Sequence, residues 1–216
     1  MESQVRGGTR WKRFAVVMVP SVAATAAIGV ALAQGALAAS FSVSGQDFKV
    51  KAGKLVGTGF SQYGAIDTGK SLEGETERHA VAVSAFNNAK ITNMCQSVVT
   101  PTPFGKVTLK LTAGNKGTDV EASQLYIDVA QLDAEDAVFE GIDIGVAAGS
   151  INKGPQPKAG EVQNKQAHPY GFAQQADRAT LTNVEQTAWA TTAGTFKLAN
   201  LSMKLAWGDG PKYECY

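Results

Sequence analysis

Hydrophobic and polar residues alternate with a period of two along much of the chain after residue 40. This alternation is typical of β-strands with one buried face, because successive side chains point to opposite sides of a strand. The clearest alternating segments are residues 41–43, 48–50, 107–111, 125–129 and 201–207. Glycine, asparagine and aspartate lie between them, as at 113–117 and 208–211, and favour turns. No convincing helical stripe is present, so the pattern predicts an all-β chain.

Two blocks of sequence occur twice in the same order. Residues 89–97 match residues 179–187, and residues 107–114 match residues 201–208. In the first block a threonine is followed by asparagine and then by a large apolar residue, and weaker copies with glycine lie at 58–62 and 137–142. Asparagine and glycine accept a left-handed or bulged backbone, so the unit predicts a kinked strand whose next residue points inward.

Repeated kinked strands favour a curved sheet, arranged as a sandwich, a β-roll or a solenoid, and periodicity does not choose among these. We therefore expect an internally duplicated curved β-sheet in residues 39–216, with related halves at about 41–117 and 118–208. Glycine and proline interrupt a polar stretch at 148–171. That stretch is typical of a long exposed loop.

The N-terminus has the three parts of an export signal. A basic region, residues 6–13, precedes an apolar run at 14–33, and Ala36 and Ala38 fit the small-x-small pattern that signal peptidase recognises. The run is also long enough for a retained membrane anchor. Its richness in alanine and the adjacent cleavage pattern favour a cleaved signal peptide at 1–38. We therefore expect a secreted protein, extracellular or associated with the cell envelope.

The two cysteines, Cys95 and Cys215, lie in the predicted mature chain. In an oxidising compartment an isolated pair is most simply one disulfide. Neither cysteine has a cysteine or histidine at metal-ligand spacing nearby. The sequence thus predicts a structural disulfide that ties the C-terminal end to the middle of the chain.

Charge and composition exclude two classes of protein. The full chain has a formal charge of +1, but residues 39–216 hold 16 basic and 18 acidic residues, a formal charge of −2. A basic nucleic-acid binder is excluded, since affinity for phosphate backbones depends on clustered positive charge. A disordered chain is also excluded, because 44% of all residues are hydrophobic and only 18% charged.

Five blocks carry a resemblance to a known family. They are residues 57–64, 93–103, 172–177, 186–198 and 207–209, with Cys215 near the end. Together they resemble a family of uncharacterised secreted actinomycete proteins whose members often bear the label "cholesterol esterase". The resemblance spans the mature chain and implies a lipid-ester hydrolase, but it carries over no catalytic residues.

The chain has weak candidates for catalysis. A serine esterase of the common kind needs Gly-x-Ser-x-Gly, and the nearest segment, at 59–64, is one residue too long. Ser61 with His79 or His168 is the available nucleophile and base, since triads are defined by geometry rather than by sequence order. No zinc, EF-hand or nucleotide-binding motif is present, so we expect no metal and no cofactor.

Three roles remain open. The first, which we favour, is a non-enzymatic extracellular or envelope protein that binds a lipid-like ligand or assembles with surface partners. An apolar face for such a ligand would contain Phe60, Met94, Ile142, Val184, Leu201 and Met203, unless these residues fill a dry core. The second role is the secreted hydrolase that the resemblance implies. The third is a structural surface protein whose repeats associate edge to edge as a homo-oligomer.

Overall fold

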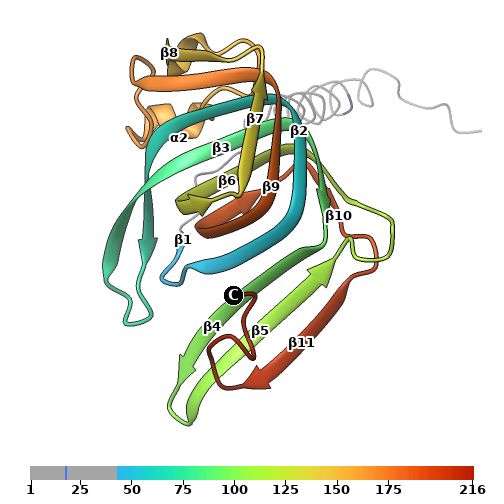
Figure 1. Ribbon diagram of the computed structural model, residues 1–216. Coiled ribbons are helices and arrows are strands. Elements are labelled where there is room, and N and C mark those ends of the chain that lie inside the picture. The colour runs from blue at the N-terminus through green and yellow to red at the C-terminus, as the bar shows by residue number, and fades with distance from the viewer. Residues whose placement is uncertain (1–17, 19–42) are drawn as a thin grey trace, which may run out of the picture. The chain divides into compact units, whose positions relative to one another are not determined.

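The computed structural model describes Met18 and residues 43–216. The strands of residues 43–216 form a single 11-stranded sheet (Figure 1). The prediction of an all-β protein is therefore confirmed. The strands are β1 (Val43–Ser44), β2 (Phe48–Lys70), β3 (Thr76–Thr92), β4 (Met94–Thr102), β5 (Gly105–Ala113), β6 (Val120–Asp133), β7 (Asp136–Glu140), β8 (Asp143–Ala147), β9 (Phe172–Thr192), β10 (Thr195–Lys197) and β11 (Ser202–Trp207). Between residues 43 and 216 helical structure is limited to η1 (Ala148–Ser150) and α2 (Ala159–Gln163).

The predicted signal peptide at 1–38 lies, except for Met18, outside the described residues. Within the described part of the chain, none of the helices has the length and apolar character needed to cross a membrane.

Four long strands pair in a closed circle, which we call the ring. β2 pairs with β3, β3 with β6, β6 with β9, and β9 again with β2, all antiparallel (Figure 1). The main hydrophobic core takes residues from all four strands, among them Leu55, Phe86, Leu125 and Leu181. Because the pairing closes on itself, the apolar face of these strands is turned inward and becomes the core.

The kinks predicted from the repeated unit are confirmed. Each of the four residues has a positive φ: Gly59 at 62°, Asn93 at 53°, Gly141 at 64° and Asn183 at 46°. The apolar residue that follows is buried in three cases, with Phe60, Met94 and Val184 each 3% exposed. The fourth, Ile142, is 37% exposed because it follows the short outer strand β7. A kink shifts the alternation by one residue, which keeps apolar side chains inside as the strand bends.

A second region, which we call the arm, consists of β4, β5 and β11 (Figure 1). β4 continues the course of β3 past the kink and is joined to the ring through residues 49–51 of β2. The repeated segments 107–111 and 203–207 pair with each other here, as neighbouring strands β5 and β11. The two predicted halves thus share one sheet, and the division at 117 and 118 stays a prediction.

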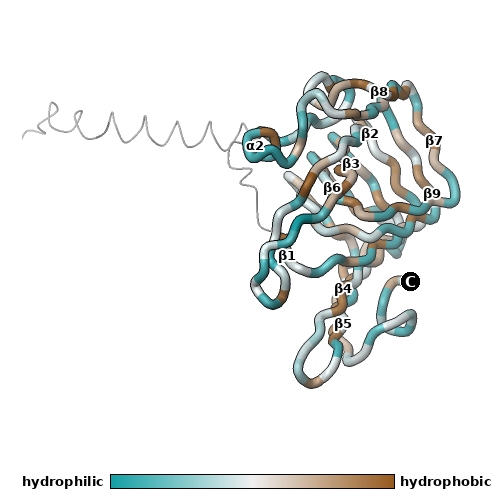
Figure 2. Tube along the Cα trace, turned by 90° about the vertical axis from the view of Figure 1, so that its left-hand side faces the viewer, coloured by the Kyte–Doolittle hydropathy of each residue, from teal (hydrophilic) through white to brown (hydrophobic). Residues whose placement is uncertain are grey.

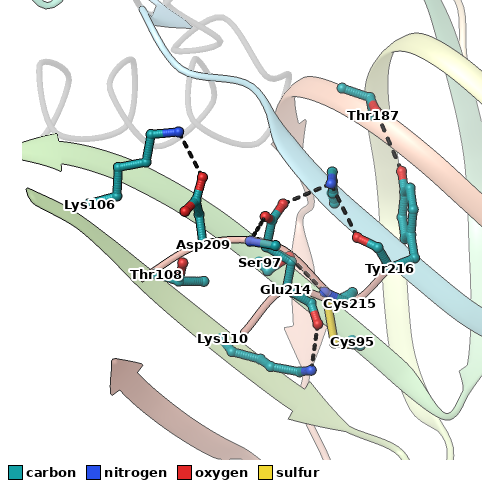
Figure 3. Close-up of polar contacts among 12 residues, drawn as sticks. Cys95, Ser97, Lys106, Thr108, Lys110, Thr187, Asp209, Glu214, Cys215 and Tyr216 are labelled. Atoms are coloured by element: carbon teal, nitrogen blue, oxygen red, sulfur yellow. Dashed lines mark hydrogen bonds and ion pairs between the residues drawn. A yellow bond between two sulfur atoms is a disulfide. The ribbon is translucent and has the colours of Figure 1, made fainter. Parts of the chain in front are cut away.

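The C-terminal tail, residues 208–216, crosses one face of the arm (Figure 3). The predicted disulfide between Cys95 and Cys215 is confirmed, with an S–S distance of 2.03 Å. The ammonium of Lys110 donates a hydrogen bond of 2.7 Å to the backbone carbonyl of Glu214. The tail is therefore held by a covalent bond and by polar contacts along its length.

Segment 148–171 is a loop, as expected, but it is packed rather than exposed. It covers the face of the ring opposite the main core and forms a second, smaller core there. Ile151 is 1% exposed and Ala167 is 3% exposed, and they pack with Tyr63 and Val83 of the ring strands. The polar composition of the segment concealed these few apolar anchors.

Candidate functional site

Ser61 does not have the surroundings of a nucleophile. It lies on β2 two residues after the kink at Gly59 and is fully buried, and its hydroxyl donates a hydrogen bond of 2.6 Å to the carbonyl of Pro155. A hydroxyl committed to a backbone carbonyl inside the protein is out of reach of a substrate. The structure therefore gives Ser61 a visible role in fixing segment 148–171 to the ring.

The two histidines lie apart from Ser61. His79 on β3 is paired with Asp67 on β2. Asp67 lies six residues from Ser61 along the same strand, which is about 20 Å of extended chain. The ring of His79 stacks on Trp189 with centroids 3.5 Å apart. His168 is exposed in the 148–171 loop, where its Nδ1 accepts a hydrogen bond of 3.2 Å from the backbone of Tyr170. The three candidates are not brought together as a triad.

The six residues expected to form an apolar-ligand face separate into two groups. Phe60, Met94 and Val184 belong to the buried core of the ring. The other three are on the surface: Ile142 after β7, and Leu201 and Met203 at the arm, exposed to 37%, 48% and 59%. They form no continuous face, but the buried three lead to a cavity.

The interior of the ring contains a cavity of about 160 Å³. Its walls are mostly apolar and come from β2, β3, β6, β7 and β9, with Leu55, Phe60, Phe86, Ile127, Phe139 and Leu181 as the large side chains. Phe60 lies between Phe86 and Phe139, with ring centroids 5.3 and 5.2 Å away. A smaller space of about 30 Å³ adjoins it and extends toward Met94.

Three polar side chains also line the cavity: Gln62, Ser84 and Gln186. Gln62 donates a hydrogen bond of 2.9 Å to the hydroxyl of Ser84 and accepts one of 2.6 Å from Gln174. We call Gln62, Ser84 and Gln186 the polar strip. The hydrogen bonds of Gln62 hold this strip in place within the otherwise apolar lining of the cavity. The outer wall is formed by Leu132 and Ala137, which are also exposed on the surface.

An acidic cluster lies on the opposite face of the ring, under segment 148–171. It consists of Asp67 on β2, Asp128 on β6 and Glu161 on α2, and the phenol of Tyr63 donates a hydrogen bond of 2.9 Å to Glu161. Burial, reinforced by the Glu161 carboxylate, raises the pKa of Tyr63. The cluster thus joins the covering segment to the ring strands.

Burial is the main cause that raises the pKa of Asp67 to about 6 and that of Asp128 to about 7. The charge of Glu161 adds to the effect at Asp67, and the charge of Asp67 adds to it at Asp128, while the ammonium of Lys158 acts in the opposite direction. Raised carboxyl pKa values occur at catalytic sites and also in structural networks. Here the neighbours are the contacts that hold the loop, and we interpret the cluster as structural.

No group of three histidine, cysteine, aspartate or glutamate side chains in the described part of the chain is arranged to hold a metal ion.

Residues 44–216 match a family of unknown function, DUF6230. The chain belongs to the DUF6230 family. No curated protein and no solved structure matches the chain. The resemblance to an uncharacterised family is confirmed in this form, and the match gives no support to the esterase label.

Two features of this DUF6230 protein were not visible in its sequence. The polar strip of Gln62, Ser84 and Gln186 comes from three different strands, and no local motif links them. The acidic cluster likewise depends on α2 folding back over β2 and β6. The ionisable Asp128 between Ile127 and Val129 was the one available signal, because an aspartate is rarely placed in the middle of a buried strand without a partner.

Proposed function

We propose that this DUF6230 protein is exported and binds a small apolar or amphiphilic molecule inside the ring. The single observation that carries this proposal is the cavity of about 160 Å³ walled by aromatic and aliphatic side chains. Protein interiors are normally packed with few voids larger than a water molecule. A chamber of this size in the main core therefore needs an explanation other than ordinary packing.

The volume limits the ligand. An apolar cavity of about 150 Å³ is large enough for benzene, whereas sites for drug-sized molecules have about 300–1,000 Å³. The chamber thus suits an aromatic ring or one short alkyl segment of about six carbons. A whole sterol exceeds it, which argues against cholesterol esters as molecules held inside this cavity.

The polar strip adds a second requirement. Gln62 and Ser84 already hydrogen-bond to each other, and an amide and a hydroxyl also retain capacity for a further partner. A ligand with one hydroxyl or carboxyl group at the end of its apolar part would match this lining. We therefore favour a short-chain alcohol or acid over a pure hydrocarbon.

Export is supported by the N-terminal signal pattern and by the disulfide, since disulfides persist mainly in oxidising compartments. Both observations agree with a protein that meets its ligand outside the cytoplasm.

Calorimetric titration of the purified, oxidised protein with hexan-1-ol and with benzene tests the proposal. We expect saturable binding of both, with hexan-1-ol the tighter. Ala137→Trp places an indole into the cavity from its outer wall and should weaken binding about tenfold or more. The matched control is Val138→Trp, because Val138 is the next residue of β7 and points to the opposite side, with 49% exposure.

Absence of saturable binding by the wild-type protein, or equal binding by both tryptophan variants, would contradict the proposal. Hydrolysis of p-nitrophenyl hexanoate is measured on the same preparations. We expect no turnover; turnover that disappears in Ser61→Ala would assign the protein to the hydrolases instead.

A further inference from the structure

The arm has two faces of opposite chemistry. In the register of β4, β5 and β11, side chains of directly paired residues share a face. One set of pairs is uncharged and largely hydrophobic, and we call it the apolar face of the arm. Its members are Gln96, Val98 and Thr100 on β4, Val107, Leu109 and Leu111 on β5, and Met203, Leu205 and Trp207 on β11.

The other face of the arm is the one that the C-terminal tail covers. Cys95, Ser97 and Lys110 belong to it, and all three contact the tail: Cys95 through the disulfide, Ser97 through the backbone of Cys215, and Lys110 through Glu214 (Figure 3). The tail thus covers the polar face and leaves the apolar face open.

The apolar face is exposed to an unusual degree. Leu205 is 71% exposed, Trp207 64% and Met203 59%. Phe104, in the turn between β4 and β5, is 87% exposed. The largest contiguous apolar patch on a soluble protein often marks a site of interaction.

The size of the face decides between two occupants. Six residues of strand are about 20 Å long, and three strands are about 14 Å wide, so the face covers on the order of 300 Å². A stable protein interface needs about 800 Å² on each partner. A second copy of this chain would therefore gain too little from the apolar face, whereas a lipid surface requires no complementary shape.

Charge also favours a lipid surface. Residues 94–113 and 202–216, the arm with its tail, contain Lys106, Lys110, Lys204 and Lys212 against two acids, Asp209 and Glu214. The region is thus net positive, although residues 39–216 as a whole have a formal charge of −2. Lys106, Lys110 and Lys204 alternate with the residues of the apolar face and so point to the tail-covered side of the arm, where Lys106 is paired with Asp209. Their net positive charge therefore acts on anionic headgroups across the thickness of the sheet, while Trp207 lies on the apolar face itself, and tryptophan is favoured at the boundary between headgroups and acyl chains.

The apolar face is continuous with the ring interior. The row of paired residues before Gln96 and Leu111 consists of Met94 and Ala113, which are both in the main core. Met94 and Gln96 also line the small space that adjoins the cavity. Hydrophobic positions accordingly run from the ring strands into β4 and β5 (Figure 2).

We propose that the apolar face of the arm docks on the surface of an anionic phospholipid bilayer, with Trp207 and Phe104 at the headgroup boundary. Docking places the apolar row that leads to Met94 and Ala113 of the main core against the lipid. The docking step does not depend on the function proposed above. Transfer of an apolar molecule from the bilayer to the cavity, in contrast, rests on that proposed function.

Flotation with vesicles of phosphatidylcholine, with and without phosphatidylglycerol, tests the docking. Wild-type protein should float with the vesicles, more strongly when phosphatidylglycerol is present and less at high salt. In a Trp189→Phe background the emission of Trp207 should shift to shorter wavelength on binding, since the predicted mature chain then contains no other tryptophan. Leu205→Glu should reduce the bound fraction about tenfold.

The matched control is Ile144→Glu, because Ile144 is 67% exposed, as Leu205 is, but lies on β8 at the ring. It should bind vesicles as the wild type does. Failure of the wild type to float, or equal floating of Leu205→Glu, would overturn the proposal. A dimer in sedimentation that Leu205→Glu dissociates would assign the face to a second copy and would also overturn it.

The two proposals fail separately. Ala137→Trp should lose hexan-1-ol and still float, while Leu205→Glu should bind hexan-1-ol and no longer float. Thermal unfolding of each variant detects a folding defect. If both variants unfold like the wild type, loss of vesicle binding in both contradicts a docking role of the arm alone.

Discussion

The ring and the arm are built from the same alternating sequence pattern, yet one hides its apolar face and the other displays it. In the ring, β2, β3, β6 and β9 pair in a closed circle, and Phe60 is 3% exposed. In the arm, β11 is the edge strand of the sheet in the described part of the chain, and Leu205 is 71% exposed. Alternation therefore tells which residues share a face, whereas strand closure decides whether that face is buried.

The two regions also differ in what covers their second face. Segment 148–171 packs over ring strands whose buried carboxyl groups, Asp67 and Asp128, have raised pKa values, while the tail covers the arm with carboxylates that are paired with lysines. The hydrogen bond and charge of Lys49 lower the pKa of Glu214, and those of Lys106 lower the pKa of Asp209. Opposite pH responses are expected from the two covers.

Removal of the disulfide should have the largest effect and should act through the arm. The bond closes a loop with a sequence separation of 120 residues. In the chain-entropy description such a loop contributes about 4–5 kcal/mol to the free energy of unfolding. Cys95→Ala with Cys215→Ala, measured by urea unfolding, should show that loss and should expose the tail to proteolysis. Resistance of the tail equal to that of wild type would contradict a covalently held cover.

Truncation of apolar side chains should separate the ring from the arm most directly. Phe60→Ala removes a buried ring from the main core and should lower the free energy of unfolding by about 4 kcal/mol. Leu205→Ala removes an exposed side chain and should change it by less than about 0.5 kcal/mol. Equal losses in urea unfolding of the two variants would show that the apolar face of the arm is covered in solution.

The contrast explains how far the sequence could predict this fold. Alternation and turns predicted the strands, and the pair Cys95 and Cys215 predicted the disulfide. The asparagine and glycine units predicted the kinks at Asn93 and Asn183 because their conformational preference is local. These features all depend on residues close together in the chain or on a unique chemical partner.

Closure of the ring was not predictable in this way. It depends on which edge of β9 meets β2 and β6, and such long-range pairing leaves no mark on local alternation. The cavity has the same origin, since Gln62, Ser84 and Gln186 meet only after closure. The kink at Gln124 was also missed, because glutamine has no local preference for its φ of 47°.

The pH dependence should distinguish the two covers. The folded-state pKa of Asp128 is raised to about 7, so the folded protein binds this proton more tightly than the unfolded chain does. The contribution of Asp128 to stability is therefore greatest below about pH 4 and falls as the pH rises to about 7. Asp128→Asn should raise the free energy of unfolding at pH 8, on the order of 2 kcal/mol, and flatten this part of the profile.

Glu214 on the arm should respond with the opposite sign. Its pKa is lowered by Lys49, so its contribution is present above the ordinary carboxyl pKa and is lost as the pH falls below it. Urea unfolding of Asp128→Asn and Glu214→Gln between pH 3 and pH 8, compared with wild type, checks both signs. If the free energy of unfolding, relative to wild type, changed with pH in the same direction in both variants, the opposite roles given to Asp128 and Glu214 would be contradicted.

The kink residues give the smallest effect and the finest comparison. Asn183 in the ring and Asn200 before β11 both have positive φ, at 46° and 55°. Alanine at either position should add about 1 kcal/mol of backbone strain. In the ring the strain cannot relax locally, because Val184 must still point into the core. Asn183→Ala should therefore lower the free energy of unfolding by about 1 kcal/mol. Asn200→Ala should instead loosen β11 alone, which hydrogen exchange of the β5–β11 pair would detect while urea unfolding hardly changes. Glycine at either position accepts the same φ and should restore the wild-type behaviour, and a glycine variant as weak as the alanine variant would show that the side chain, rather than the backbone, is responsible.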